Sequence, residues 1–377
     1  MAANTKLFEP LQVGTMKLSN RIAMAPLTRF RAHDDHVHSD MAIEYYTQRA
    51  APVPGTLIIT EATPVSARAG NYPNVPGVYT DAQIKKWKQI VDAVHAKGSY
   101  IYLQMWALGR TANQDCLREE TGLKVKSSSA VPLLDETGGP PPQPEELTEE
   151  EILGLINDYA TGAKNAVEGA GFDGVEIHGA NGYLVDQFTQ DVCNQRTDRW
   201  GGSVENRSRF GLEVAKAVSA AVGGDKVGFR ISPYNTWQGM GMKDPIPQFT
   251  HLVENLKQFK LAYLHIVEAR VAGIEDANTN ESVDFAIEAW GKTSPILLAG
   301  GFKPDTAVQA LEGKHKDRDV VMAFGRYFIS NPDIVYRIRE GIELTPYDRN
   351  TFYTPKVAKG YTDYSFSEKY LKETKSA

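Results

Sequence analysis

Short apolar runs alternate with longer amphipathic stretches along most of the chain. The runs show no polar alternation, which is typical of strands covered on both faces in a parallel sheet. They span residues 21–25, 56–60, 100–105, 174–177, 227–231, 263–267, 296–299 and 320–324. Helical periodicity spans residues 40–49, 81–97, 148–169, 203–222, 246–259, 281–289 and 305–311. Eight strands alternating with helices predict an α/β fold, a (β/α)8 TIM barrel.

Two stretches of the sequence lie outside the eight strand–helix units of a minimal barrel. Residues 6–20 have the pattern of a hairpin turning at Val13-Gly14-Thr15, which we expect to plug the bottom of the barrel. Residues 111–146, rich in Ser, Pro, Gly and charge, form a long insertion after the third strand. An insertion there lies on the catalytic face, where it either shapes substrate access or is a solvated loop. No repeat or linker interrupts the pattern, so we expect a single domain over residues 1–377.

Composition and charge limit the partners and the cell compartment that we expect for this protein. The 377 residues carry a formal net charge of -6 with the basic residues spread out, which argues against nucleic acid as a partner. Cys116 and Cys193 are the only cysteines, too few for a disulfide framework, which favours a reducing compartment. The chain starts without a signal-peptide core, and no run approaches the ~18 apolar residues of a membrane span. We therefore expect a cytoplasmic protein that does not bind membranes.

The run over residues 174–177 ends abruptly in polar residues. Active sites of α/β barrels lie at the carboxyl ends of the strands. His178 and Asn181 can both donate hydrogen bonds to a substrate oxygen, and Tyr183 carries a phenolic proton. We expect His178 and Asn181 to hold an oxygen and Tyr183 to act as an acid.

Other strand ends also carry polar or small residues. Thr28 offers a hydroxyl to a ligand or caps a helix, and Ala62 lets a flat ligand approach the backbone. Gln104 suits a ring with alternating carbonyl and N–H groups, or is a buried glutamine bonded to backbone. Arg230, inside an apolar run, is a fixed positive charge beside an anionic cofactor or part of a structural salt bridge.

Aromatic residues follow two of these strands. Trp106 and Trp237 are candidates for the wall of a substrate pocket, although Trp106 also fits the core. Gly300 and Gly301 follow the seventh strand, and Gly325 and Arg326 follow the eighth. The loops after these two strands form the usual phosphate site of this fold. Exposed backbone N–H groups and an arginine favour a phosphate-bearing cofactor over ordinary tight turns.

Three histidines, His33, His36 and His38, lie close together in one polar stretch. They lack the regular helical spacing of metal ligands, so we expect a solvated loop and no metal. The glycine fingerprint of a nicotinamide-binding Rossmann unit does not follow the first strand. A nicotinamide dinucleotide would therefore visit as a substrate.

Two classes of function are compatible with these residues. One is a flavin oxidoreductase that uses the phosphate clamp, the amide, the arginine and the tyrosine acid. The other is a non-redox lyase or isomerase acting on a phosphorylated substrate. A lyase needs a Schiff-base lysine or a carboxylate base. The available candidates are Lys292, Lys303, Glu61 and Glu268.

Specific motifs resemble the Old Yellow Enzyme family of FMN-dependent ene-reductases, which includes the plant oxophytodienoate reductases. The motifs are Ala25-Pro26-Leu27-Thr28-Arg29, His178-Gly179-Ala180-Asn181-Gly182-Tyr183-Leu184, Asp198-Arg199-Trp200-Gly201-Gly202-Ser203 and Phe324-Gly325-Arg326-Tyr327-Phe328-Ile329-Ser330-Asn331-Pro332. Among its members the chain looks most like fungal ones, several of which act on chanoclavine aldehyde in ergot alkaloid pathways. A reductase or an isomerase of such an aldehyde is therefore an alternative to a general enone reductase.

The resemblance implies a site for FMN, with NADPH as co-substrate and an α,β-unsaturated carbonyl compound as the small-molecule partner of a monomer or homodimer. The implied contacts to the flavin ring are Pro26, Thr28, Ala62, Gln104 and Arg230, and those to its phosphate are Gly300, Gly301, Gly325 and Arg326. Phe352 and Tyr353 would close over the cofactor. The implied pocket walls are Tyr72, Trp106, Trp237 and Tyr353.

The resemblance also implies the roles of the polar end of the fourth strand. His178 and Asn181 would bind the carbonyl oxygen, and Tyr183 would protonate the α-carbon after hydride reaches the β-carbon. A tyrosine at this position favours net reduction over isomerisation. The chain departs from the family pattern at Ala62, where some members have glycine, and at Arg110, where the yeast enzymes have an aromatic residue.

Overall fold

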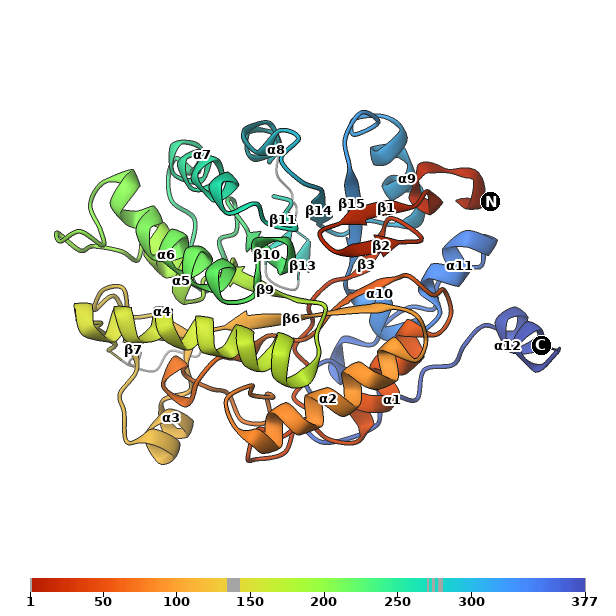
Figure 1. Cartoon of the computed structure of the whole chain (residues 1–377), viewed down its shortest axis with the longest axis horizontal. Helices are drawn as coiled ribbons and strands as arrows, with labels where there is room; N and C mark the ends of the chain where they lie inside the picture. Colours follow the sequence, from red (N-terminus) through yellow and green to blue (C-terminus); the bar gives the residue numbers. More distant parts are fainter. Residues whose placement is uncertain (1, 134–142, 270, 273–274, 277–280, 377) are drawn as a thin grey trace.

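Eight parallel strands close into a barrel in the computed structural model, which describes residues 2–133, 143–269, 271–272, 275–276 and 281–376 (Figure 1). Each strand pairs with the next, and the last pairs with the first, which closes the sheet. The strands are β3 (Ile22–Met24), β4 (Leu57–Ile59), β6 (Tyr100–Trp106), β9 (Gly174–Gly179), β10 (Val227–Ile231), β11 (Tyr263–Val267), β14 (Ile296–Ala299) and β15 (Val320–Phe324). The predicted (β/α)8 barrel is confirmed.

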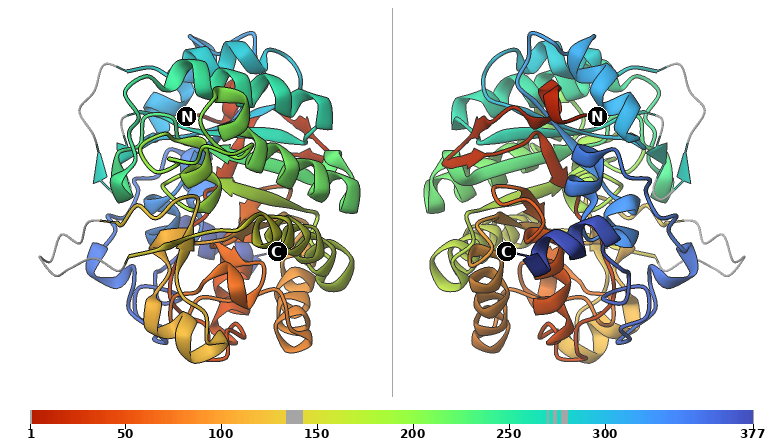
Figure 2. Two further views of the ribbon diagram at one scale, coloured as in Figure 1. Left: turned by 90° about the vertical axis from the view of Figure 1, so that its left-hand side faces the viewer. Right: turned by 90° about the vertical axis from the view of Figure 1, so that its right-hand side faces the viewer.

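Every predicted helix is present, and the helices surround the strands in both views of Figure 2. They are α1 (Met41–Ala50), α2 (Asp81–His95), α4 (Glu149–Lys164), α6 (Val204–Val222), α7 (Pro245–Leu256), α8 (Asp284–Trp290) and α9 (Pro304–Glu312). Thr148 caps the start of α4 with a capping box. The π-helical turn Asn165–Ala170 continues α4 at its other end.

Short elements were not predicted. The additional helices are α3 (Gln114–Thr121), α5 (Leu184–Thr189), α10 (Arg326–Ser330), α11 (Ile334–Glu340) and α12 (Glu368–Ser376). Besides a strand pair in the insertion described below, the additional strands are β5 (Thr63–Pro64), β12 (Val271–Ala272) and β13 (Glu275–Asp276). The shortest of these helices, α5 and α10, contain too few turns for a periodic apolar face to be recognised. None of the described helices is both long enough and apolar enough to span a bilayer.

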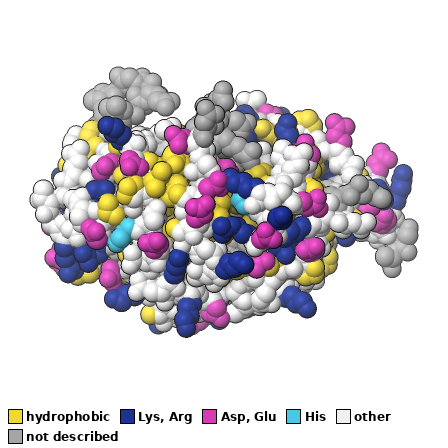
Figure 3. All heavy atoms as spheres, turned by 90° about the horizontal axis from the view of Figure 1, so that it is seen from above, with side chains coloured by type: hydrophobic (Ala, Val, Ile, Leu, Met, Phe, Trp, Pro, Cys, Tyr) yellow, Lys and Arg dark blue, Asp and Glu magenta, His cyan; other side chains and the backbone are white. Residues whose placement is uncertain are grey.

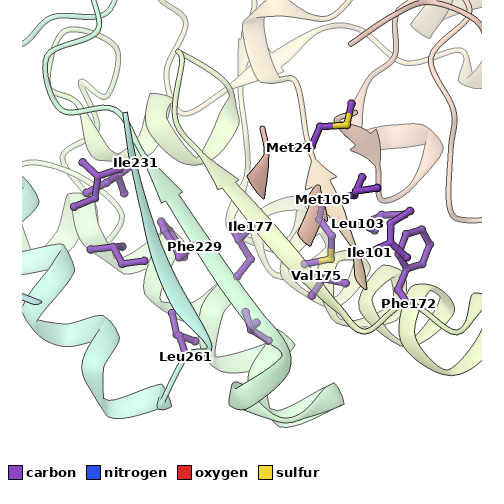
Figure 4. Packing of buried hydrophobic residues seen from close by; sticks show 14 of the residues in the cluster. Met24, Ile101, Leu103, Met105, Phe172, Val175, Ile177, Phe229, Ile231 and Leu261 are labelled. Carbon is purple, nitrogen blue, oxygen red and sulfur yellow. The ribbon is translucent and has the colours of Figure 1, made fainter. Parts of the chain in front are cut away.

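Side chains on each barrel strand alternate between an outer and an inner layer. Ile101, Leu103 and Met105 of β6 pack outward into the main core under the helices, as do Val175 and Ile177 of β9 (Figure 4). The intervening positions face the barrel interior. The lower layer, where the strands begin, is apolar, and the upper layer combines polar side chains such as Gln104 and His178 with alanines of β14 and β15. Because both layers are buried, the strands appear in the sequence as continuous apolar runs.

A hairpin of β1 (Leu11–Val13) and β2 (Met16–Leu18) closes the lower end of the barrel, near β3 in Figure 1. The buried side chains of both strands join the lower interior layer, which includes Tyr102 and Tyr263. At the turn, Gly14 has a φ of +53°, and a Cβ there would lie 2.1 Å from the carbonyl oxygen of Asp225. The predicted plug is therefore present, and its turn requires glycine.

The predicted insertion after the third barrel strand includes α3 and the parallel pair β7 (Lys126–Ser127) and β8 (Glu145–Glu146). Its proline-rich part, Gly138-Gly139-Pro140-Pro141-Pro142, lies outside the described residues. Just before the insertion, Arg110 donates hydrogen bonds to backbone carbonyls of the loop after β10. The insertion therefore begins beside the carboxyl ends of the strands.

Lys and Arg side chains are interspersed with Asp and Glu on the face shown in Figure 3.

The expectation that residues 33–40 form a solvated loop is wrong for two of the three histidines. His36 and His38 are buried and bonded to Glu120 and Glu61, respectively, whereas His33 is exposed. Hydrogen bonds to acidic residues from later segments offset the cost of burying these imidazoles. The polarity of residues 33–40 alone does not indicate those partners.

Candidate active site

A pocket of about 480 Å³ lies at the carboxyl ends of the barrel strands. This volume is typical of sites for small molecules and cofactors. Every residue proposed for the site from the sequence contributes to its lining. They are Pro26, Thr28, Ala62, Tyr72, Gln104, Trp106, His178, Asn181, Tyr183, Arg230, Trp237, Gly300, Gly301, Gly325, Arg326 and Tyr353.

His178 is the inward-facing residue near the end of β9, in register with Arg230 on β10. Burial, and then the positive charge of Arg230, hold the pKa of the imidazole well below its ordinary value. A neutral imidazole carries one N–H donor and one acceptor nitrogen. Nδ1 of His178 is buried without a hydrogen-bond partner among the described residues. Because the neutral ring also lines the pocket, its N–H can donate to a neutral or anionic ligand oxygen there.

Asn181 lies in a tight turn directly after β9. Its φ is +59°, a left-handed conformation that asparagine tolerates better than most residues. Ser232 accepts a 2.8 Å hydrogen bond from its backbone N–H, and Gln238 donates a 2.8 Å bond to its carbonyl. The backbone is thus held on both sides, which leaves the side-chain amide available at the pocket wall.

Tyr183 ends this turn and packs edge-to-face on Trp106, with ring centroids 4.7 Å apart. The ring of His178 lies 4.9 Å away on another side. Burial raises the pKa of the Tyr183 phenol well above its ordinary value. The hydroxyl therefore keeps its proton at neutral pH and is available as a donor next to His178.

Glu176, which the sequence reasoning missed, lies inside the barrel one layer below His178. It accepts hydrogen bonds from Gln104 (2.8 Å), Tyr263 (3.0 Å) and His265 (2.8 Å). Burial disfavours ionisation, but His265 and Arg230 outweigh it and hold the pKa of the carboxyl below its ordinary value. Like Arg230, Glu176 and His265 interrupt apolar runs, and this was the signal available in the sequence.

This carboxylate orients Gln104. The side-chain N–H of Gln104 that bonds Glu176 is directed away from the pocket, so its carbonyl oxygen and second N–H remain for a ligand. The Nε atom of Arg230 is buried without a hydrogen-bond partner in the described part of the chain. The carboxylate of Glu176 thus compensates the charge of Arg230. Arg230 lines the pocket and retains one N–H donor without a partner among the described residues.

The opposite end of the pocket is built by the loops after β14 and β15. Gly301 has a φ of +65°, and the helix α9 begins three residues later. Gly325 precedes Arg326, the first residue of α10. Lys303, which the sequence reasoning considered only as a loop lysine, also lines the pocket. Two cations and glycine-rich backbone suit an anionic group.

A C-terminal segment forms one wall of the pocket through Phe352 and Tyr353. Arg29 and Arg31, in the loop after β3, both donate to the carbonyl of Phe352, at 3.0 Å and 2.8 Å. Both guanidiniums are fully buried. The position of this wall therefore depends on contacts between the two ends of the chain.

Comparison with known proteins fits this geometry, since residues 6–345 match the NADH:flavin oxidoreductase / NADH oxidase family. The chain belongs to this family. It is 56% identical over 373 residues to chanoclavine-I aldehyde reductase fgaOx3 of Penicillium roqueforti, covering 99% of this chain and 100% of that protein. It is 53% identical over 372 residues to NADP-dependent oxidoreductase lnbE of Aspergillus flavus, covering 97% of each. The crystal structure of Old Yellow Enzyme from Pichia sp. AKU4542 has a TM-score of 0.89 at 39% identity, covering 98% of this chain and 95% of that one.

The resemblance to Old Yellow Enzymes is therefore confirmed, and the protein is an oxidoreductase of the FMN-dependent family. The pocket fits this cofactor. Its glycine-rich, cationic end suits a phosphate, and its other end has buried donors without partners among the described residues, on Trp106, His178 and Arg230. Unpartnered buried donors are costly, so a polar ligand is expected to satisfy them.

The lyase alternative needed a Schiff-base lysine or a carboxylate base, and of its four candidates only Lys303, at the cationic end, is among the described lining residues. Glu61 is buried and bonded to Nε2 of His38 at 2.9 Å, and neither Glu61 nor Glu268 is among the described lining residues. Because the chain belongs to a flavin oxidoreductase family, the oxidoreductase interpretation holds and the lyase interpretation does not. A separate group outside the pocket, His36, Cys116 and Glu120, is joined by hydrogen bonds of 2.7 Å and 2.8 Å to the Glu120 carboxylate.

Proposed function

We propose that this flavin oxidoreductase reduces the carbon–carbon double bond of α,β-unsaturated aldehydes and ketones, with NADPH as the electron donor. One observation carries the proposal: two hydrogen-bond donors, His178 and Asn181, and a protonated phenol, Tyr183, lie together on one pocket whose other end is cationic. When bound, FMN supplies the hydride, which it takes from the nicotinamide nucleotide.

The ring end of the site is proposed to consist of Pro26, Thr28, Ala62, Gln104 and Arg230. The phosphate is proposed to bind Gly300, Gly301, Gly325 and Arg326, with Lys303 as a further cation. The positive charge of Arg230 is held by the protein before reaction begins, so it can stabilise negative charge without reorganisation. Its nearness to Glu176, which favours its charged form, supports this role.

The proposed chemistry at the substrate adds a hydride to the β-carbon and a proton to the α-carbon. His178 and Asn181 donate hydrogen bonds to the carbonyl oxygen, which becomes more negative as the hydride arrives. Tyr183 gives its proton to the α-carbon and recovers one from water. Tyr72, Trp106, Trp237 and Tyr353 are proposed to position the carbon skeleton.

The proposed substrates are bulky conjugated aldehydes such as chanoclavine-I aldehyde. The 56% identity to a reductase named for that aldehyde supports this choice. The 53% identity to an NADP-dependent oxidoreductase supports NADPH over NADH. An isomerase acting on the same aldehyde is less favoured, because Tyr183 can deliver the proton that prevents the hydride from returning.

The test uses purified protein reconstituted with FMN. We expect flavin absorbance to remain with the protein after gel filtration, and NADPH oxidation under anaerobic conditions to require an added enone or enal. Mass spectrometry should find a product heavier than the substrate by two hydrogens. Failure to retain FMN, or an isomerised product of unchanged mass, would contradict the proposal.

A further inference from the structure

Gln238 lies in the loop after β10, outside the residues predicted from the sequence, and its backbone is left-handed with φ 60° and ψ 34°. Its side-chain amide donates a 2.8 Å hydrogen bond to the carbonyl of Asn181, which has a φ of +59°. Left-handed backbone is unfavourable for residues other than glycine and is retained only where surrounding contacts hold it. Two such residues are here bonded to each other at the pocket.

Arg110 holds this loop from the opposite side. Its guanidinium donates to the carbonyls of Gln238 (2.9 Å) and Gly239 (3.2 Å). Its backbone N–H donates to Gln187, which in turn donates a 2.8 Å bond to the carbonyl of Gly182. The turn that carries Asn181 and Tyr183 is therefore connected to Arg110 along two routes.

Gly182 permits the close approach of the two loops. A Cβ at this residue would lie 2.9 Å from the Cβ of Gln238, closer than real side chains pack. The φ of Gly182 is +78°, which also favours glycine. The Gln238 side chain thus lies directly against the turn that carries Tyr183, with its amide bonded to the Asn181 carbonyl.

The amide of Gln238 can act on the Tyr183 hydroxyl as well. A primary amide has two N–H groups, and only one is needed for the Asn181 carbonyl. Burial raises the pKa of Tyr183, and the nearby Gln238 side chain opposes that rise. A bond that favours ionisation of a phenol is one donated to its oxygen.

We propose that Gln238 is a positioning residue for the acid, holding the Asn181–Tyr183 turn and donating a hydrogen bond to the phenol oxygen as Tyr183 gives up its proton. In that step the O–H bond of Tyr183 breaks, a C–H bond forms at the α-carbon of the substrate, and the electron pair stays on the oxygen. Water then returns a proton to Tyr183. This inference rests on the proposed role of Tyr183 as the acid.

The test is stopped-flow reoxidation of the reduced holoenzyme by an enone across pH. Gln238→Met keeps the length of the side chain and removes both N–H groups. We expect reoxidation to slow about tenfold, the effect of losing one hydrogen bond of about 1.4 kcal/mol. The alkaline limb of its pH profile should move to higher pH, and reduction by NADPH should keep its rate.

A double-mutant cycle with Tyr183→Phe separates positioning from general damage. In the Tyr183→Phe background, Gln238→Met should have no further effect on reoxidation. An equal slowing in both backgrounds, or an unshifted pH profile, would overturn the inference. Normal reoxidation in Tyr183→Phe itself would instead overturn the proposed function.

If the Gln238→Met variant does not retain FMN, Arg110→Met is a second variant that tests the same inference. It removes the contacts to the backbone of the loop and leaves the Gln238 amide in place. We expect a smaller slowing of reoxidation that also disappears in the Tyr183→Phe background. A slowing that persists there would contradict the proposed connection from Arg110 through Gln238 to Tyr183.

Discussion

Arg31 donates a 2.8 Å hydrogen bond to the carbonyl of Phe352, a residue 321 positions later in the chain. The other bonds of the same guanidinium reach the carbonyls of Arg29, Thr351, Val357 and Lys359. All five of its N–H groups can be used in this way. Arg31, together with Arg29, thus fixes the C-terminal wall of the pocket from near the start of the barrel.

Arg31→Lys is expected to loosen this wall. Lysine has three donors and no planar fork, so at least two of the five bonds are lost. We expect the free energy of unfolding to fall by about 3–6 kcal/mol, because each of the two lost bonds from a buried charged donor contributes about 1.5–3 kcal/mol. Urea unfolding measures this, and hydrogen exchange should increase at residues 349–360. The exposed Arg199→Lys is the control, and unchanged exchange would contradict the assignment.

Tyr183→Phe should separate the two half-reactions. The high pKa of Tyr183 keeps it protonated at neutral pH, so the wild type always holds a proton for the substrate. Its loss should slow enone-dependent reoxidation by ~10²–10⁴-fold, the usual contribution of a general acid. FMN binding and reduction by NADPH should stay near normal. Tyr72→Phe, at another pocket tyrosine, is the matched control. Unchanged enone turnover would refute the role.

His178→Ala combined with Asn181→Ala should weaken binding of phenols, which resemble an enolate and give a long-wavelength charge-transfer band with oxidised flavin. Each lost donor to a charged oxygen is worth about 1.5–3 kcal/mol, so affinity should fall at least tenfold for each change. Because the pKa of His178 lies well below its ordinary value, wild-type affinity should show no His titration near neutral pH. Unchanged affinity in the double variant would contradict the oxygen-binding role.

Asp186 should make stability depend on pH. It is buried and accepts a 2.9 Å hydrogen bond from the N–H of Gly182. Burial raises the pKa of Asp186 to about 7. The folded protein then keeps a proton that the unfolded chain loses near pH ~4. This contribution to stability is fully present below that value, falls as the pH rises, and is lost above about pH 7.

Asp186→Asn removes this titration. Between about pH 5 and 7, the unfolding free energy of the wild type should fall relative to that of the variant by about 2 kcal/mol. Urea unfolding at several pH values measures the difference, with the exposed Asp191→Asn as the control. Parallel curves for wild type and Asp186→Asn would show that Asp186 does not titrate in this range.

The barrel and the residues lining its pocket were predictable because each depends on a local pattern. A continuous apolar run identifies a strand, and the polar residue that ends it then lies at the catalytic face. His178, Gln104 and Arg230 were found in this way. Neither prediction requires knowledge of which distant residue each side chain meets.

The remaining features depend on long-range partners. Glu176 bonds His265, 89 positions away, and Gln238 bonds Asn181, 57 positions away. His36 and His38 were expected to be solvated because their segment is polar, but acidic residues from other segments bury them. Such pairs arise from tertiary packing, which a single sequence does not encode in its spacing.

The N-terminal hairpin closes the lower end of the barrel, because its buried side chains pack into the lower interior layer. In the proposed reaction, the nucleotide that brings electrons and the enone that takes them would therefore both have to reach the pocket from the carboxyl ends of the strands. Each then becomes a competitor of the other at high concentration. Turnover would be governed by the ratio of the two reactants in the cell as well as by the amount of either one.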